Sequence, residues 1–248
     1  MDTIKPQKFG TLYGIGVGPG DPDLITVKAV RIIGRVDVIF AASSTKNRHS
    51  QAVNIASAHI PASATVHLLS FPMCSDPEVL AGARRANARE IIAVLRSGRD
   101  AAFLTLGDPL TYSTFGYVLK YVKEIAPELS VVSVPGITSY QAAAARVNQP
   151  LVEGNESLLV MSGVNGGAAY RDISPEPENL VFLKAYRGAG DIARALEAGG
   201  RTKGSIAITN CGLANEEVVS DIGRFKETPP GYWTLIISKK PATNGAGG

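Results

Sequence analysis

Short apolar runs alternate with amphipathic stretches over the first 134 residues of the chain. Apolar runs without alternation are typical of strands in a parallel sheet, because helices cover both faces of such a sheet. The predicted strands are residues 11–17, 36–40, 66–69, 101–106 and 131–134. Apolar positions at helical spacing predict helices over residues 23–33, 51–58 and 115–125, and a longer one from Pro77 to Gly98 with Asp76 as its N-cap. This βαβ order indicates a mostly parallel five-stranded sheet.

The pattern changes after Val134, where strands and helices no longer alternate regularly. Strands are predicted over residues 157–161, 179–183 and 205–209, and helices over 138–146 and 191–197. Residues 217–222 and 232–238 look like antiparallel partners of each other, separated by Pro229-Pro230-Gly231. We therefore expect two α/β domains: a parallel one over 8–134, a mixed one over 135–240, and a disordered Gly-rich tail over 241–248. Because no flexible linker is visible, we expect the domains to pack closely around a ligand-binding cleft.

One buried strand, residues 101–106, ends abruptly in Gly107-Asp108-Pro109 and is followed by Thr111, Tyr112, Ser113 and Thr114. Ligands of open α/β sheets bind outside the carboxyl ends of the strands, so a carboxylate and four hydroxyls at this edge suggest a site. An ordinary turn followed by a helix N-cap is the alternative. Residues 18–22 and 135–139 follow two other predicted strands. In a parallel sheet all three loops project on the same side, which favours a site.

The glycines of the first predicted strand and loop, Gly14, Gly16 and Gly18, suggest a dinucleotide-binding loop. That motif requires an acidic residue after the next strand. Ala41-Ala42-Ser43-Ser44 follows Phe40 instead, which argues against a nucleotide-dependent oxidoreductase.

Composition narrows the class further. The 248 residues are 45% hydrophobic and 19% charged, which is close to an average globular protein. The net charge of +3 is too small to indicate the basic surface that binds nucleic acid, but it is compatible with an anionic small-molecule substrate. Cys74 and Cys211 lie outside any CxxC motif and are expected to be free, buried thiols, and the three histidines lack metal-ligand spacing. No apolar run approaches the ~20 residues of a membrane span, and the first residues lack a signal-peptide core. A cytoplasmic protein that binds no metal, membrane or nucleic acid is expected.

Several of these segments occur together, and in the same order, in one family. The segments are GIGVGPGDPDLITVKAV near the start, LTLGDPLTYST in the centre and VVSVPGITS after it. Over residues 11–238 the chain resembles the tetrapyrrole methyltransferases. These are the S-adenosylmethionine (SAM)-dependent enzymes of sirohaem and corrinoid synthesis. Tyr-Ser-Thr after Gly-Asp-Pro, with an earlier Phe-Pro-Met, is similar to the branch that methylates C20 of precorrin-2 or cobalt-factor II in cobalamin biosynthesis. Methylation elsewhere on a tetrapyrrole, such as uroporphyrinogen III or a later precorrin, and a non-catalytic tetrapyrrole carrier remain alternatives.

The resemblance also implies roles for individual residues and a homodimer. SAM would lie in the cleft between the domains. The implied cofactor residues are Pro19, Leu106, Gly107, Asp108, Thr111, Thr138, Ser139, Lys184 and Gly212. Lys184 departs from the Met common in relatives, and the alternative role for its ammonium is contact with a substrate carboxylate. Asp108 would hold a ribose hydroxyl or an amino group or accept a proton, and Tyr112 would bind substrate or take the C20 proton. Substrate would contact Lys28, Lys46, Arg48, Ser113, Thr114 and Arg187, although solvated surface charge is the simpler role for each cation.

Overall fold

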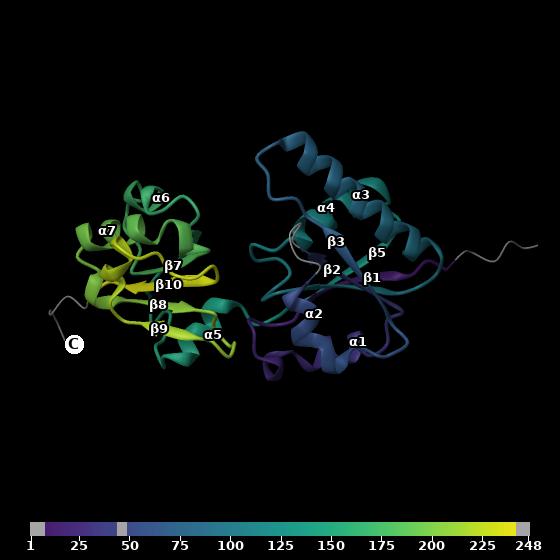
Figure 1. The fold of residues 1–248 in the computed structure, drawn as a ribbon, viewed down its shortest axis with the longest axis horizontal. Coiled ribbons are helices and arrows are strands. Elements are labelled where there is room, and N and C mark those ends of the chain that lie inside the picture. Colours follow the sequence, from purple (N-terminus) through teal and green to yellow (C-terminus); the bar gives the residue numbers. More distant parts are fainter. Residues whose placement is uncertain (1–7, 44–48, 242–248) are drawn as a thin grey trace, which may run out of the picture. The chain divides into compact units, whose positions relative to one another are not determined.

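The computed structural model describes residues 8–43 and 49–241 (Figure 1). The chain divides into two compact units, the first ending at Thr138 and the second beginning at Ser139. Each unit contains one five-stranded sheet with helices, so the expectation of two α/β domains is confirmed. The predicted tail, apart from Pro241, lies outside the described residues, as do Lys46 and Arg48.

The sheet of the first unit has the strand order β3-β2-β4-β1-β5, and every neighbouring pair is parallel. Its strands are β1 (Thr11–Gly16), β2 (Val38–Ser43), β3 (Thr65–Ser70), β4 (Ala101–Thr105) and β5 (Ser130–Val134). Its helices are α1 (Val27–Ile33), α2 (Gln51–Ala56), α3 (Pro77–Arg96) and α4 (Phe115–Ile125), with 3-10 turns η1 (Pro22–Leu24) and η2 (Ser57–His59). The predicted parallel sheet is confirmed.

Both faces of this sheet are covered, which explains its continuous apolar strands. On one face, Phe103 and Phe40 pack with residues of α3 and α4. On the other face, Leu104 and Ile39 pack with residues of α1 and α2. All five residues of the central strand β4 are buried.

The predicted start of α3 is confirmed: Pro77 is its first residue, and the Asp76 carboxylate accepts the Glu78 and Val79 N–H groups at 2.9 and 3.3 Å. The continuous helix predicted over residues 23–33 is wrong. The chain instead forms η1, becomes extended at Ile25, and begins α1 after Thr26, whose hydroxyl accepts the Ala29 N–H. The extended backbone lets Ile25 enter the core on the α1 side of the sheet.

The second unit has a mixed sheet with the order β6-β7-β10-β8-β9, in which only β6 and β7 are parallel among the described strands. Its strands are β6 (Leu158–Ser162), β7 (Asn179–Leu183), β8 (Ser205–Thr209), β9 (Glu217–Val219) and β10 (Thr234–Lys239). Its helices are α5 (Ser139–Arg146), α6 (Ala168–Arg171) and α7 (Ala189–Ala198), with 3-10 turns η3 (Ala185–Arg187), η4 (Thr202–Gly204) and η5 (Ile222–Lys226). The short helix α6 lies between two predicted strands, where the sequence pattern predicts no helix.

The predicted pairing of residues 217–222 with 232–238 is wrong. β9 and β10 pair with opposite edges of β8, so β8 lies between them. The chain leaves β9 to form η5, which buries Ile222 and Phe225 in the core beside α7. Because Ile222 and Phe225 are buried there, the segment after β9 cannot turn back directly to form a hairpin with β10. β10 instead lies between β7 and β8.

The two cysteines are both free, but only one matches the prediction. Cys211 is buried, whereas Cys74 is exposed in the segment between β3 and α3, so the expectation of a buried Cys74 is wrong. Packing in this segment is loose, and the neighbouring Met73 is 70% exposed. Among the described residues, no helix is both long and apolar enough to cross a membrane.

Candidate active site

The three loops with site-like sequences follow three adjacent strands, β4, β1 and β5. Gly18, after β1, and Gly107, after β4, exchange two main-chain hydrogen bonds: Gly107 N to Gly18 O at 2.7 Å and Gly18 N to Gly107 O at 3.3 Å. The expectation that these loops project at one edge of the sheet is confirmed. We call the loops over residues 17–22, 106–114 and 135–138 the loop edge.

Close main-chain contacts hold the loop edge together. A methyl group at Gly136 would lie 2.2 Å from the Gly107 carbonyl oxygen and 2.8 Å from Gly16 Cα. A methyl group at Gly16 would likewise lie 2.4 Å from the same oxygen. At Gly14 it would lie 2.1 Å from the Phe115 ring. Of the glycines that resemble a nucleotide loop, Gly14 and Gly16 are therefore required for packing between neighbouring segments, whereas Gly18 adopts a left-handed backbone with φ +81°.

Asp108 ties two of the loops together. Its Oδ1 accepts the Leu110 N–H at 2.9 Å and the Thr111 hydroxyl at 3.3 Å, which fixes its own turn. Its Oδ2 accepts the Gly136 N–H at 3.2 Å, across to the loop after β5. A carboxylate has about four lone-pair directions, so these three bonds leave room for about one further donor.

The residues of the hydroxyl-rich segment after Asp108 differ in their exposure and hydrogen bonding. The Ser113 hydroxyl lies 2.8 Å from Thr105 Oγ1 and accepts the Phe115 N–H at 3.1 Å, so it joins the end of β4 to the start of α4. Tyr112 is 48% exposed with φ +51°, a left-handed conformation that is uncommon for a non-glycine residue. Such backbone positions cluster at functional sites. Thr114 is half-buried and precedes α4 without a side-chain cap bond.

The remaining predicted residues of the first unit divide into two groups. At the loop edge, Pro19 and Thr138 are buried, and Leu106 and Thr111 are half-buried. Lys28 is exposed in the first turn of α1, the helix that follows the loop after β1 by way of η1. Ser139 is the first residue of α5 and belongs to the second unit.

In the second unit, predicted residues follow the carboxyl ends of β7 and β8. Lys184, directly after β7, is exposed with φ +56°, and Arg187 ends the following 3-10 turn. After β8, Asn210 has φ +54° and Gly212 has φ +78°. The Gly212 N–H donates to Glu216 Oε2 at 2.8 Å, so this turn is closed by a carboxylate.

Sequence reasoning missed the residues around Gly212. Burial raises the pKa of the Cys211 thiol to about 11, and the Glu216 carboxylate adds to that effect. Burial also raises the pKa of Glu216, but the Gly212 N–H and the Arg146 guanidinium outweigh it, so that pKa is lowered. Cys211 is therefore a protonated, packed thiol at neutral pH. A glycine followed four residues later by an acid is too common a pattern to have revealed this turn.

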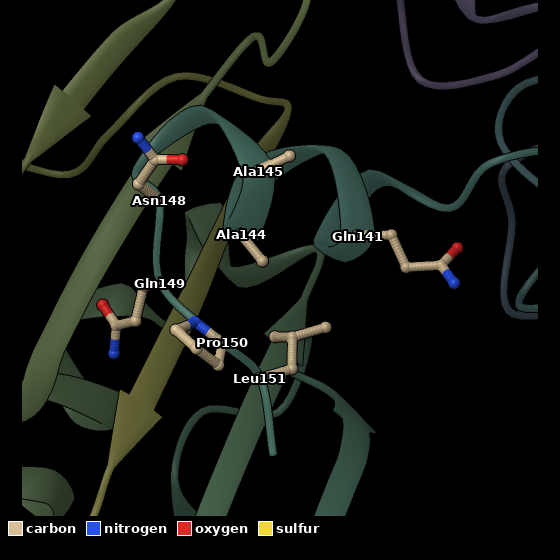
Figure 2. Close-up of a pocket in the computed structure, with 7 residues that line it drawn as sticks. All are labelled: Gln141, Ala144, Ala145, Asn148, Gln149, Pro150 and Leu151. Carbon is tan, nitrogen blue, oxygen red and sulfur yellow. The ribbon is translucent and has the colours of Figure 1, made fainter. Parts of the chain in front are cut away.

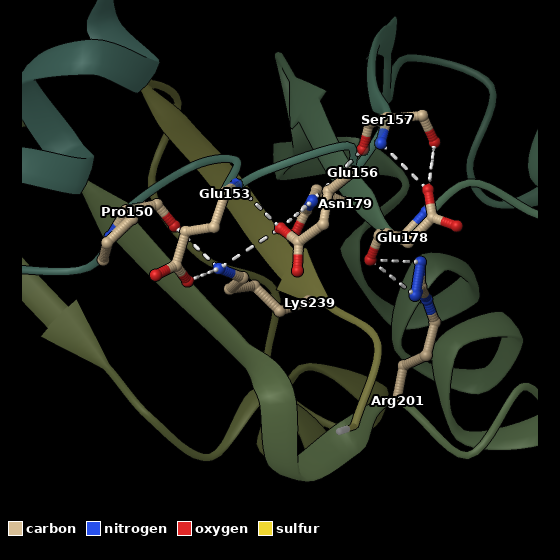
Figure 3. Close-up of polar contacts among 8 residues, drawn as sticks. All are labelled: Pro150, Glu153, Glu156, Ser157, Glu178, Asn179, Arg201 and Lys239. Carbon is tan, nitrogen blue, oxygen red and sulfur yellow. Dashed lines mark hydrogen bonds and ion pairs between the residues drawn. The ribbon is translucent and has the colours of Figure 1, made fainter. Parts of the chain in front are cut away.

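Two further features of the second unit involve none of the predicted residues. A pocket beside the end of α5 is lined by Gln141, Ala144, Ala145, Asn148, Gln149, Pro150 and Leu151 (Figure 2). At the opposite end of β7 from Lys184, Glu178 accepts the Ser157 N–H and hydroxyl, and buried Arg201 donates to the Glu178 carbonyl at 3.1 Å (Figure 3). Lys239 bonds to Glu153 at 3.1 Å in the same network. These contacts stabilise the sheet at the end of β7 that is opposite Lys184.

Fold and local geometry together define the class of protein. It has two α/β units, and in the first unit the loop edge lies at the carboxyl ends of parallel strands, where glycines allow close main-chain contacts. Residues 11–226 match the model of the Tetrapyrrole (Corrin/Porphyrin) Methylases, and the chain belongs to this family. The predicted resemblance is confirmed.

Individual relatives agree with this membership. The chain is 30% identical over 232 residues to the cobalt-precorrin-2 C(20)-methyltransferase of Salmonella typhimurium, covering 93% of this chain and 97% of the relative. It is 29% identical over 237 residues to a precorrin-2 C(20)-methyltransferase of Sinorhizobium, covering 92% and 94%. The structure of uroporphyrin-III C-methyltransferase from Thermus thermophilus in complex with S-adenosylhomocysteine has the same fold, with a TM-score of 0.65 at 22% identity over 93% of this chain and 98% of that one.

Proposed function

We propose that this protein is a SAM-dependent methyltransferase that transfers a methyl group to C20 of precorrin-2 or its cobalt complex in cobalamin biosynthesis. The observation that carries the proposal is similarity over nearly the whole of both chains to relatives named for this reaction. The family separates the protein from the nucleotide-dependent oxidoreductases.

Features of the loop edge fit a cofactor that meets main-chain atoms. Gly107 is buried with φ +68°, yet a methyl group placed on it would meet, among the described residues, only the Ile137 carbonyl oxygen, at 3.9 Å. A glycine with free space beside its Cα lets a ligand approach the backbone closely. We propose that Pro19, Leu106, Gly107, Asp108, Thr111, Thr138 and Ser139 hold SAM, together with Lys184 and Gly212 of the second unit.

When bound, SAM supplies a methyl group activated by its sulfonium. The C20 carbon of a reduced tetrapyrrole is already electron-rich, so the protein's main task is alignment. In this proposal Asp108 keeps the loops of β4 and β5 in register and accepts one donor from the cofactor. Tyr112, displayed by its left-handed backbone, holds the substrate at C20 and takes the leaving proton.

The substrate carries carboxylates around its rim, which basic side chains recognise. We propose that Arg187 and Lys28 contact these groups, with Lys46 and Arg48, and that Thr114 donates to the substrate. The bonds of the Ser113 hydroxyl to Thr105 and Phe115 favour a role in shaping the loop that faces the substrate. We further propose a homodimer, on the family resemblance alone, and a cytoplasmic location, as the sequence pattern predicts and as fits relatives that are biosynthetic enzymes.

The deciding experiment is incubation of the protein with SAM and precorrin-2, with and without cobalt, followed by location of the new methyl group by NMR. A methyl group at C20 supports the proposal, and the faster of the two reactions identifies the natural substrate form. A methyl group at another carbon, or no transfer to either substrate, contradicts it.

A further inference from the structure

Three aromatic side chains form a cluster at the carboxyl-end edge of the second unit's sheet. The rings of Tyr186 and Tyr232 lie 4.7 Å apart between centroids, and those of Tyr232 and Trp233 lie 6.1 Å apart. The Arg187 guanidinium lies 5.4 Å from the Tyr186 ring. We call Tyr186, Tyr232 and Trp233 the aromatic cluster.

Main-chain and hydroxyl bonds fix the position of the aromatic cluster. The Asn210 N–H donates to the Trp233 carbonyl at 3.0 Å, and the hydroxyls of Thr209 and Thr234 lie 2.7 Å apart. These bonds hold the start of β10 against the end of β8, while Tyr186 follows the end of β7 on the other side of β10. The cluster therefore shares one sheet edge with Lys184 and Gly212.

Two of the three rings are exposed although hydrogen bonds anchor their backbone. Tyr232 is 55% exposed and Trp233 is 41% exposed, neither belongs to a core cluster of the unit, and Tyr186 is half-buried. Fold stability does not require two exposed rings on well-anchored backbone. Anchored aromatic groups are instead typical of surfaces on which a flat conjugated ligand stacks.

We infer that the aromatic cluster is the surface against which the face of the tetrapyrrole stacks, with Arg187 paired to one of its peripheral carboxylates. The inference rests on the proposed function and adds positioning residues to it. Charge and shape favour the macrocycle as the occupant. Its conjugated face is large enough to meet more than one ring, and its carboxylates complement the guanidinium. The adenine of SAM is smaller and carries no anionic group for Arg187.

Trp233 is the single tryptophan of the chain, so its fluorescence reports directly on this surface. Titration with cobalt-factor II should quench it saturably, beyond the inner-filter loss measured with free N-acetyltryptophanamide. Tyr232→Leu should raise KM for the tetrapyrrole about tenfold, while Tyr232→Phe, which keeps the ring, should stay within about twofold of wild type. Both variants should bind SAM in calorimetry as wild type does. Tyr117→Leu removes another exposed tyrosine ring, 43% exposed, from α4 and should leave KM unchanged.

Unquenched Trp233 at saturating tetrapyrrole, or an unchanged KM in Tyr232→Leu, overturns the inference. Loss of SAM affinity in Tyr232→Leu with unchanged tetrapyrrole KM also overturns it, because the cluster would then belong to the cofactor. The proposed function fails separately. If the macrocycle quenches Trp233 in the wild-type protein but is not methylated at C20, the result supports the stacking surface and contradicts the reaction.

Discussion

Asp108→Asn should uncouple the loops after β4 and β5 while changing the shape of the side chain very little. In the native protein both carboxylate oxygens accept: Oδ1 from Leu110 and Thr111, and Oδ2 from Gly136 at 3.2 Å. An amide has only one accepting oxygen. In one orientation its NH₂ group faces the Gly136 N–H, and in the other it faces the Leu110 N–H, so a donor opposes a donor in both.

The size of the effect follows from these bonds. Hydrogen bonds to a charged group contribute roughly 1.5–3 kcal/mol each, and a part-buried donor left without an acceptor costs a similar amount. We expect Asp108→Asn to lower the free energy of unfolding by about 1–3 kcal/mol. If SAM binds at the loop edge as proposed, its affinity should fall about tenfold or more, because each 1.4 kcal/mol of lost binding is a factor of ten.

Urea unfolding followed by circular dichroism gives the stability change, and calorimetric titration gives the SAM affinity. Asp76→Asn is the matched control: Asp76 caps α3 through Oδ1, and asparagine caps nearly as well, so we expect a loss below about 1 kcal/mol and unchanged SAM binding. Equal unfolding midpoints and equal SAM affinities for Asp108→Asn and wild type would refute the reasoning.

Gly136→Ala should destabilise the first unit by about 1–3 kcal/mol or prevent its folding, since the new methyl would lie 2.2 Å from a backbone oxygen. The control Gly82→Ala, an open helical position within the described residues, should stabilise by about 0.5–1 kcal/mol in the same denaturation assay, and similar destabilisation in both variants would contradict the packing argument. Tyr112→Phe should slow single-turnover methyl transfer while SAM affinity stays unchanged, and an equal rate would remove this residue from the catalytic set. The Ser157 hydroxyl and N–H lower the pKa of Glu178 to about 2 from 4.5, so their contribution to stability is present above pH 4.5 and is lost as the pH falls towards 2. Ser157→Ala should therefore lose less stability than wild type between pH 5 and 3, and parallel unfolding curves over that range would argue against the assignment.

The first unit could be predicted closely because its information is local. Unbroken apolar strands, Asp76-Pro77 at a helix start and the loops after three strands each follow from a short segment, and the parallel order then places the loops at one edge. The sequence cannot show that Gly16, Gly107 and Gly136 touch, because that contact depends on which strands are neighbours.

The second unit was less predictable because its strand neighbours are set by distant burial. The segment between β9 and β10 resembles a hairpin connection, but Ile222 and Phe225 complete the core against α7 and the two strands separate. The aromatic cluster has the same origin: Tyr186 and Tyr232 are distant in sequence and meet only because β10 inserts beside β7.

The contact of Gly16, Gly107 and Gly136 consists of main-chain atoms, so the base of the loop edge does not depend on the chemistry of the surrounding side chains. Evolution or protein engineering can therefore vary the residues that surround this base, and with them the molecule that is methylated, without rebuilding the support beneath. Conversely, a change at one of these glycines is unlike a change at a substrate contact: it alters the scaffold for every ligand at once.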